Sequence, residues 1–87
     1  MHEAGLMTSL MQRIDGIART ERAQRVVSVS VWLGALSHMS AAHFHEHFEQ
    51  ASAGTLAEGA RLEVTVSDDT QDSNAQDMLL KSVEVET

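Results

Sequence analysis

The chain has 87 residues, a length that suits one small domain with a single two-layer core. Its formal net charge is −7 and its six Lys and Arg residues do not cluster, which argues against a nucleic-acid partner. Because the chain has no cysteine, it cannot form disulfides or thiolate sites, and a metal site would have to use His, Asp, Glu or backbone nitrogen.

The first three residues, Met1-His2-Glu3, offer a set of metal ligands. A bulky second residue argues that Met1 is retained, so the terminal amine, the amide nitrogen of His2 and its imidazole can converge on one ion. That donor set suits square-planar Ni(II) or Cu(II). Protonation at lower pH should weaken binding, since the amine and the ring must both be deprotonated. On spacing alone the signal is weak, and an exposed histidine without a ligand is the alternative.

Residues 3–20 are predicted to form an amphipathic helix, because apolar side chains recur at i, i+3, i+4 and i+7. Arg13 interrupts this segment, and no apolar run approaches the roughly 20 residues of a membrane span. Glu3 lies where a signal peptide would carry positive charge. We therefore expect a cytoplasmic protein without membrane contact. The apolar positions of the helix are Leu6, Met7, Leu10, Met11, Ile14, Ile17 and Ala18.

Three segments, residues 25–33, 61–66 and 78–85, are predicted to be strands. In the first, Val27, Val29, Val31 and Leu33 alternate with Ser28, Ser30 and Trp32. Trp32 therefore falls on the face opposite the valines, as a partly exposed aromatic or a contact for a partner protein. In the last strand the alternation changes phase, which predicts a bulge near Leu80–Lys81 or burial on both faces. The polar residues 67–76 are expected to form a short loop between neighbouring strands.

A second helix is expected from Ser40, a good N-cap residue, to Ser52. Its predicted buried stripe consists of Ala41, Phe44, Phe48 and Ala51. The chain therefore predicts an α+β fold in the order α-β-α-β-β, with two helices packed on one face of a small three-stranded sheet.

Histidines are concentrated in and just before this second helix. His43 and His47 stand at i and i+4, a spacing at which two rings can share a divalent cation. They form either an auxiliary site for nickel or zinc or a solvated polar rim of the helix. His38 precedes the helix and is either a substitute metal ligand or an ordinary loop histidine.

Several segments together resemble the HypA/HybF hydrogenase nickel-incorporation proteins. The resemblance covers nearly the whole chain. Its motifs are Met1-His2-Glu3 opening a helix, Gly34-Ala35-Leu36-Ser37, Phe48-Glu49, Gly54-Thr55-Leu56-Ala57-Glu58-Gly59-Ala60 and Met78-Leu79-Leu80-Lys81-Ser82-Val83-Glu84-Val85.

The resemblance implies a protein that delivers Ni(II) for maturation of NiFe-hydrogenase, with a nickel site on Met1, His2 and Glu3. It implies a maturation GTPase or the hydrogenase large subunit as the partner. The family normally inserts a zinc domain with two Cys-x-x-Cys pairs between the last two strands. Here residues 67–76 replace it, so we expect a single domain over residues 1–87 and no structural zinc. Ser40 stands where the family often has an acid near the nickel site.

We therefore expect a nickel-binding accessory protein, without intrinsic turnover because no catalytic motif is present. The alternative is a metal-independent interaction or assembly scaffold that keeps the fold after loss of the zinc domain. Trp32 and the acidic surface would then contact partners. Exposed strand edges also leave a homodimer open.

Overall fold

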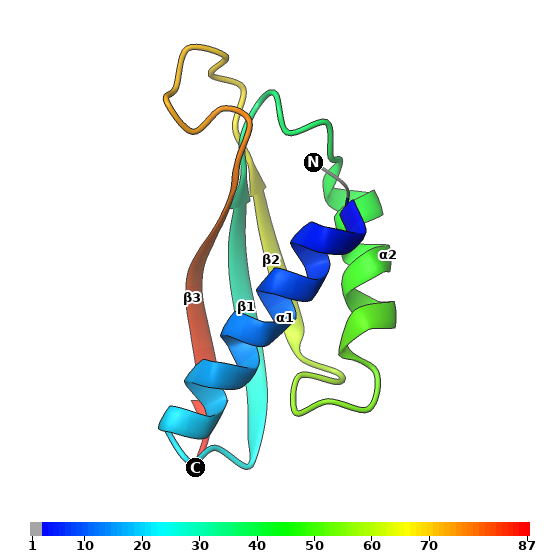
Figure 1. The fold of residues 1–87 in the computed structure, drawn as a ribbon, viewed down its shortest axis with the longest axis vertical. Coiled ribbons are helices and arrows are strands. Elements are labelled where there is room, and N and C mark those ends of the chain that lie inside the picture. Colours follow the sequence, from blue (N-terminus) through cyan, green and yellow to red (C-terminus); the bar gives the residue numbers. More distant parts are fainter. Residues whose placement is uncertain (1–2) are drawn as a thin grey trace.

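The computed structural model describes the backbone of residues 3–87 and the side chains of residues 5–87. Both helices cover one face of a three-stranded sheet, which confirms the predicted fold class (Figure 1). Among the described residues, no helix is long and apolar enough to cross a membrane. In chain order the elements are α1 (Glu3–Thr20), β1 (Arg25–Leu33), α2 (Ala41–Ser52), β2 (Arg61–Val66) and β3 (Met78–Glu86).

The sheet has the strand order β2-β1-β3. β2 runs parallel to β1, as the helical crossover through α2 requires, and β3 runs antiparallel to β1. The expectation that residues 67–76 join neighbouring strands is wrong, because β2 and β3 flank β1. Leu33, the last residue of β1, pairs with both Val66 and Met78. The connection between the edge strands therefore passes over the end of the central strand.

The core lies between the helix layer and the inner face of β1. Leu10 and Ile14 of α1 and the two phenylalanines of α2, Phe44 and Phe48, are at most 2% exposed. Burying such side chains contributes roughly 1.5–3 kcal/mol each. The predicted apolar faces are confirmed at these positions, whereas Ile17 and Ala41 are exposed, because each lies at the edge of its helical stripe.

Two register shifts between β1 and β3 alter the simple alternation. On β3, Ser82 pairs with Ser30 and Leu80 with Val31, so Lys81 is left without a pairing partner, and the bulge predicted near Leu80–Lys81 is confirmed. On β1 the extra residue is Val27. The prediction that Val27 shares a face with Val29 and Val31 is wrong, because the shift moves Val26 inward (2% exposed) and leaves Val27 37% exposed.

Residues 67–77 are closely tied to the end of β1. The Ser67 amide donates to the Leu33 carbonyl at 2.9 Å, and the Gly34 amide donates to the Asp77 carbonyl at 2.9 Å. Ala75 is 4% exposed, and its carbonyl accepts from the Leu36 amide at 2.6 Å. A side chain at Gly34 would collide with that carbonyl. The connection is thus a packed cap on the sheet.

Candidate metal-binding site

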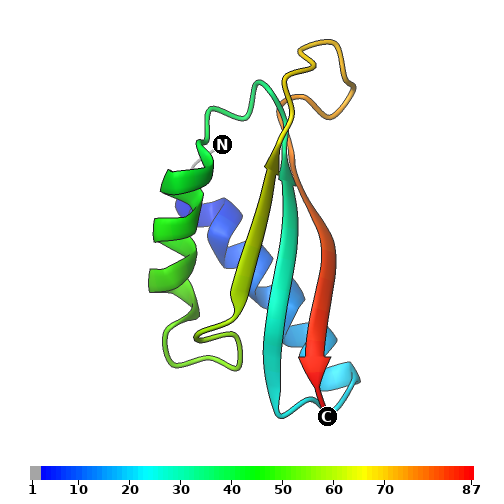
Figure 2. The same cartoon turned by 180° about the vertical axis from the view of Figure 1, so that it is seen from behind.

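α1 and α2 pack together and begin at the same end of the molecule. Seen from the front and from behind, the first turns of both helices lie side by side, near the connection from β1 to α2 (Figures 1 and 2). The two helices run in roughly the same direction from that end. Equivalent turns of the two helices can therefore meet across their interface, although they are far apart in sequence.

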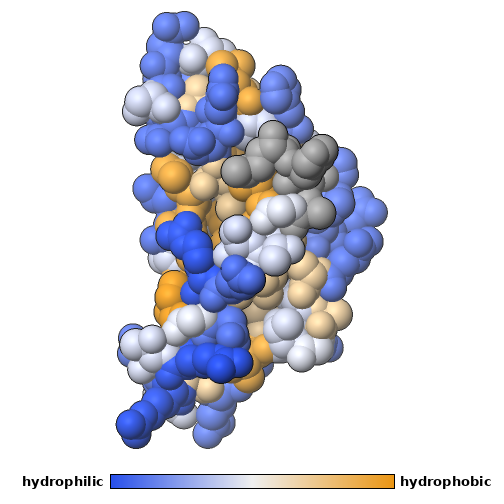
Figure 3. Space-filling model, in the orientation of Figure 1, coloured by the Kyte–Doolittle hydropathy of each residue, from blue (hydrophilic) through white to orange (hydrophobic). Residues whose placement is uncertain are grey.

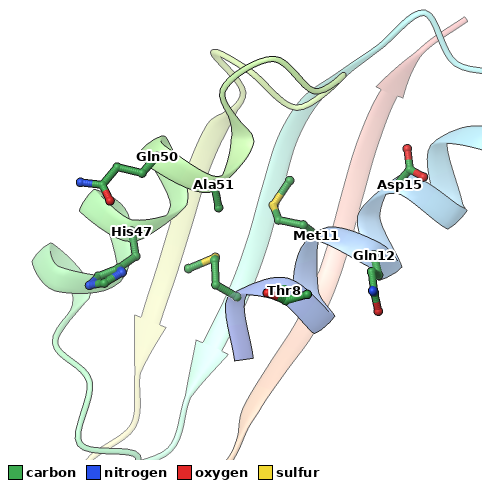
Figure 4. A pocket seen from close by; sticks show the side chains of 8 residues that line it. Thr8, Met11, Gln12, Asp15, His47, Gln50 and Ala51 are labelled. Atoms are coloured by element: carbon green, nitrogen blue, oxygen red, sulfur yellow. The ribbon is translucent and has the colours of Figure 1, made fainter. Parts of the chain in front are cut away.

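A groove of about 590 Å³ separates the two helices (Figure 4). Its apolar floor consists of Met7, which is 5% exposed, and the half-buried Met11 and Ala51. The methionines predicted at core spacing thus fill the helix interface. The polar rim consists of Thr8, Gln12 and Asp15 from α1 and His47 and Gln50 from α2.

One member of the α2 histidine pair, His47, lines this groove. The ring centroids of His43 and His47 are 4.7 Å apart, with an angle of 48° between the ring planes. His43 is exposed and His47 is half-buried in the groove wall. The i, i+4 spacing therefore brings two imidazoles together, as the sequence indicates. Within the described part of the chain, no three His, Asp or Glu side chains gather closely enough to hold a metal ion.

The other described histidines point elsewhere. His45 lies on a different side of α2, where its Nδ1 is 3.4 Å from a carboxylate oxygen of Glu49. His38 is exposed, has a left-handed backbone with φ of 62°, and lines a hollow of about 420 Å³ with Leu6 and Asp77. The structure therefore separates His38 from the His43–His47 pair, although its hollow borders the first turns of α1.

The family model described as "Hydrogenase/urease nickel incorporation, metallochaperone, hypA" matches residues 1–74. The chain belongs to the HypA family. It is 36% identical over 64 residues to a hydrogenase maturation factor HypA of Chlorobium limicola, covering 74% of this chain and 55% of that protein. The HypA of Archaeoglobus fulgidus is 35% identical over 66 residues, covering 76% of this chain and 60% of that protein. The HypA-family chain thus spans between half and two thirds of these relatives.

Solved structures show the same fold. The solution structure of the nickel metallochaperone HypA from Helicobacter pylori superposes with a TM-score of 0.80 at 20% identity, covering 99% of this chain and 98% of that one. A second HypA solution structure gives a TM-score of 0.75 at 21% identity, with 98% and 96% coverage. At this level of identity the likeness concerns the fold alone.

The predicted N-terminal nickel ligands of this HypA-family chain are Met1, His2 and Glu3. Met1 and His2 lie outside the described residues. The backbone of Glu3 begins α1, and its side chain is not among those described. The role of all three as nickel ligands remains a prediction.

Ser40 has a structural role in this HypA-family chain. It is the N-cap of α2, with φ of −88° and ψ of 156°, and its Oγ accepts a hydrogen bond from the His43 amide at 3.1 Å. This confirms the predicted cap. Such caps typically stabilise by about 1 kcal/mol.

Trp32 lies on the face of the sheet that the helices leave open. It is half-buried and pairs with Thr65 on β2 and Leu79 on β3, as expected for a residue opposite the core valines. Its partner contact remains a prediction. The sequence alone does not indicate that Thr8 and Gln12 of α1 line the groove, because only the packing of the two helices brings them to the same groove as His47.

Proposed function

We propose that this HypA-family protein binds Ni(II) and passes it on during the maturation of NiFe-hydrogenase. The observation that carries this proposal is the family match, which is described as nickel incorporation and includes the N-terminus, both helices and the first two strands. The names of the related hydrogenase maturation factors support the same function. The recipient would be a maturation GTPase or the hydrogenase large subunit.

The proposed ligands are the Met1 amine, the amide nitrogen and ring of His2, and Glu3. A terminal amine, a deprotonated amide and an imidazole suit a square-planar Ni(II) ion. Of these three residues, Glu3 is the first residue of α1. A site of this kind is accessible for both loading and release, as a carrier requires.

In this proposal the protein carries nickel without a zinc domain. The chain has no cysteine, and residues 67–77 lead directly from β2 to β3. The packed cap that these residues form on the end of β1 completes the sheet without a further metal. Residues 1–87 would then act as a single nickel-binding unit.

The test is Ni(II) titration calorimetry at pH 7.5 on protein with an authentic, untagged Met1. We expect one-site binding with a Kd in the micromolar range or tighter, and a loss of at least about 100-fold in His2→Ala. His45→Ala, which removes an exposed histidine paired with Glu49, serves as the matched control and should bind as the wild type does. Equal affinity in wild type and His2→Ala would refute the N-terminal site.

A metal-independent scaffold is the second candidate, favoured by the open face of the sheet. There Trp32 and Leu79 lie in register on adjacent strands, with no helix over them. A scaffold would bind the hydrogenase large subunit equally well with and without nickel. That binding would survive His2→Ala and be weakened in Trp32→Ala.

A further inference from the structure

We infer that the hollow between α1 and the end of the cap binds an arginine side chain presented by a partner protein. This hollow of about 420 Å³ shares no lining residue with the α1–α2 groove. Arginine binding here needs no nickel, so it is independent of the proposed nickel site. The residues that line the hollow are Leu6, Leu36, Ser37, His38, Gln76 and Asp77.

The two main walls of the hollow are fixed to each other by the backbone. One wall is the connection from β1 to α2, which includes Leu36 and Ser37, and the other is the end of the cap at Asp77. The Leu36 amide donates to the Ala75 carbonyl at 2.6 Å, and the Gly34 amide donates to the Asp77 carbonyl at 2.9 Å. The hollow is therefore formed before a ligand binds. A preformed site loses less free energy on binding than one that must first be ordered.

Ser37 contributes a hydroxyl group that lacks a partner. Its Oγ is buried and makes no hydrogen bond within the described part of the chain. Nearly all buried polar groups in folded proteins are hydrogen-bonded, because an unpaired one costs stability. Rotation about one single bond turns the hydroxyl between staggered positions, so it can meet a donor that enters the hollow. The unpaired hydroxyl thus points to a ligand that supplies a hydrogen-bond donor.

The charge around the hollow favours a cation. Residues 67–77 contain four aspartates and no Lys, Arg or His. Of these aspartates, Asp77 lines the hollow. Among the described side chains, no Lys or Arg forms an ion pair with Asp77. The summed negative charge of the cap repels an anion and attracts a positively charged group to this end of the molecule.

The mixture of lining groups fits a guanidinium better than an ammonium or a metal ion. Asp77, the Gln76 side-chain carbonyl and the Ser37 hydroxyl are acceptors from two walls, and a guanidinium offers several N–H donors in a planar fork. A carboxylate can accept two parallel hydrogen bonds from that fork. Leu6 and Leu36 provide apolar surface for the methylene groups of the arginine stem. Among the described residues, no group of three or more His, Asp or Glu is arranged to hold a metal ion.

The surroundings of the hollow favour a protein segment as the carrier of this arginine. Leu36 lines the hollow and is 37% exposed, so a segment that continues beyond the arginine can cover it. In Figure 3 the cap at the top is mostly hydrophilic, and apolar atoms show below it between α1 and β3. An arginine next to apolar side chains matches both surfaces, and arginine is enriched at the centres of protein interfaces.

The test follows ligand binding to the nickel-free protein by two-dimensional ¹H–¹⁵N NMR. The probe is N-acetyl-arginine methylamide, and the uncharged citrulline and the lysine analogues are the matched ligand controls. We expect saturable shifts of the Ser37, His38 and Asp77 amides, with at least about 10-fold weaker binding of citrulline because it lacks the charge. The acetylated and amidated tripeptide leucyl-arginyl-leucine should bind more tightly than the single residue, since it also covers Leu36.

Matched variants separate the hollow from the general charge of the cap. Asp77→Asn should weaken arginine binding at least about 10-fold, because it removes a charge-assisted acceptor. Asp68→Asn removes the same charge from a cap residue that does not line the hollow, and should bind nearly as the wild type does. Ser37→Ala should weaken binding without lowering the Tm, because it removes a hydroxyl that is unpaired in the described structure.

Several results would overturn the inference. They are the absence of saturable shifts with the arginine analogue, equal binding of citrulline or lysine, and wild-type arginine affinity in Asp77→Asn. Equal affinity for the tripeptide and the single residue would make the hollow a small-molecule site rather than a partner surface. If Ni(II) shifts the same amides in the wild type but not in His38→Ala, the hollow is a metal site instead. None of these results affects the proposed N-terminal nickel site, which His2→Ala tests by nickel affinity.

Discussion

The cap over β1 and the groove between α1 and α2 differ in how completely they are packed. In the cap, backbone groups of residues 67–77 hydrogen-bond to the end of β1, and Ala75 leaves no room for a side chain at Gly34. In the groove, the helices meet only along the floor, and the polar side chains above it surround open space. The cap therefore maintains the sheet, whereas the groove has room for a ligand.

The contrast explains how a small HypA-family chain can lack cysteine and still hold its strands together. The end of the sheet is closed by backbone hydrogen bonds and by the buried Ala75. Substitutions in the cap should thus reduce stability, whereas those of exposed residues at the groove rim should leave it nearly unchanged.

The largest effect is expected from Gly34→Ala. The added methyl group would collide with the Ala75 carbonyl, which the Leu36 hydrogen bond holds in place. Overpacking of this kind typically costs 1–3 kcal/mol, so we expect the free energy of unfolding to fall by about 2 kcal/mol. Urea unfolding followed by circular dichroism measures the change.

Gly16→Ala is the matched control for this substitution. Gly16 lies on the exposed side of α1, and a methyl group there meets no atom within 4 Å. Because Ala is favoured over Gly in a helix, the free energy of unfolding should rise by roughly 0.5–1 kcal/mol. If both variants change stability in the same direction, the contrast between tight cap and open helix surface is wrong.

Local patterns in the sequence were sufficient for the fold class. Period 3.6 in residues 3–20, period 2 in residues 61–66 and the cap at Ser40 each involve near neighbours in the chain. The change in the alternation of apolar and polar residues near Leu80–Lys81 likewise predicted the bulge. The strand order could not be predicted from the sequence, because a polar loop can join two adjacent strands or pass over the end of a strand that lies between them. The bulge at Val27 was hidden because Val26 and Val27 are equally apolar.

A smaller loss of stability is expected from Ser40→Ala. The change removes the acceptor for the His43 amide at the start of α2. We expect the free energy of unfolding to fall by about 1 kcal/mol, as for other N-cap serines. Ser40→Asn, which can restore the cap, should recover most of the loss. A loss of similar size in both variants would mean that the hydroxyl has another role.

For the site, the sequence predicted individual donors but not their arrangement. The i, i+4 spacing of His43 and His47 was enough to place their rings together. Whether that pair faces the start of α1 depends on the direction in which two distant helices pack, and no local pattern carries that information. The isolation of His38 also depends on tertiary structure, since its hollow is closed by Asp77 from the far end of the chain.

The smallest effect is expected from Gln12→Ala at the groove rim. Gln12 is exposed and forms part of the rim, and it is not among the proposed nickel ligands. Surface substitutions of this kind usually change stability by no more than about 0.5 kcal/mol, so both the free energy of unfolding and the Kd for nickel should stay close to wild type. Calorimetry beside His47→Ala makes the comparison direct, because Gln12 and His47 line the same groove from opposite helices. Equal losses of nickel affinity in the two variants would mean that binding depends on the groove as a whole rather than on the His47 imidazole.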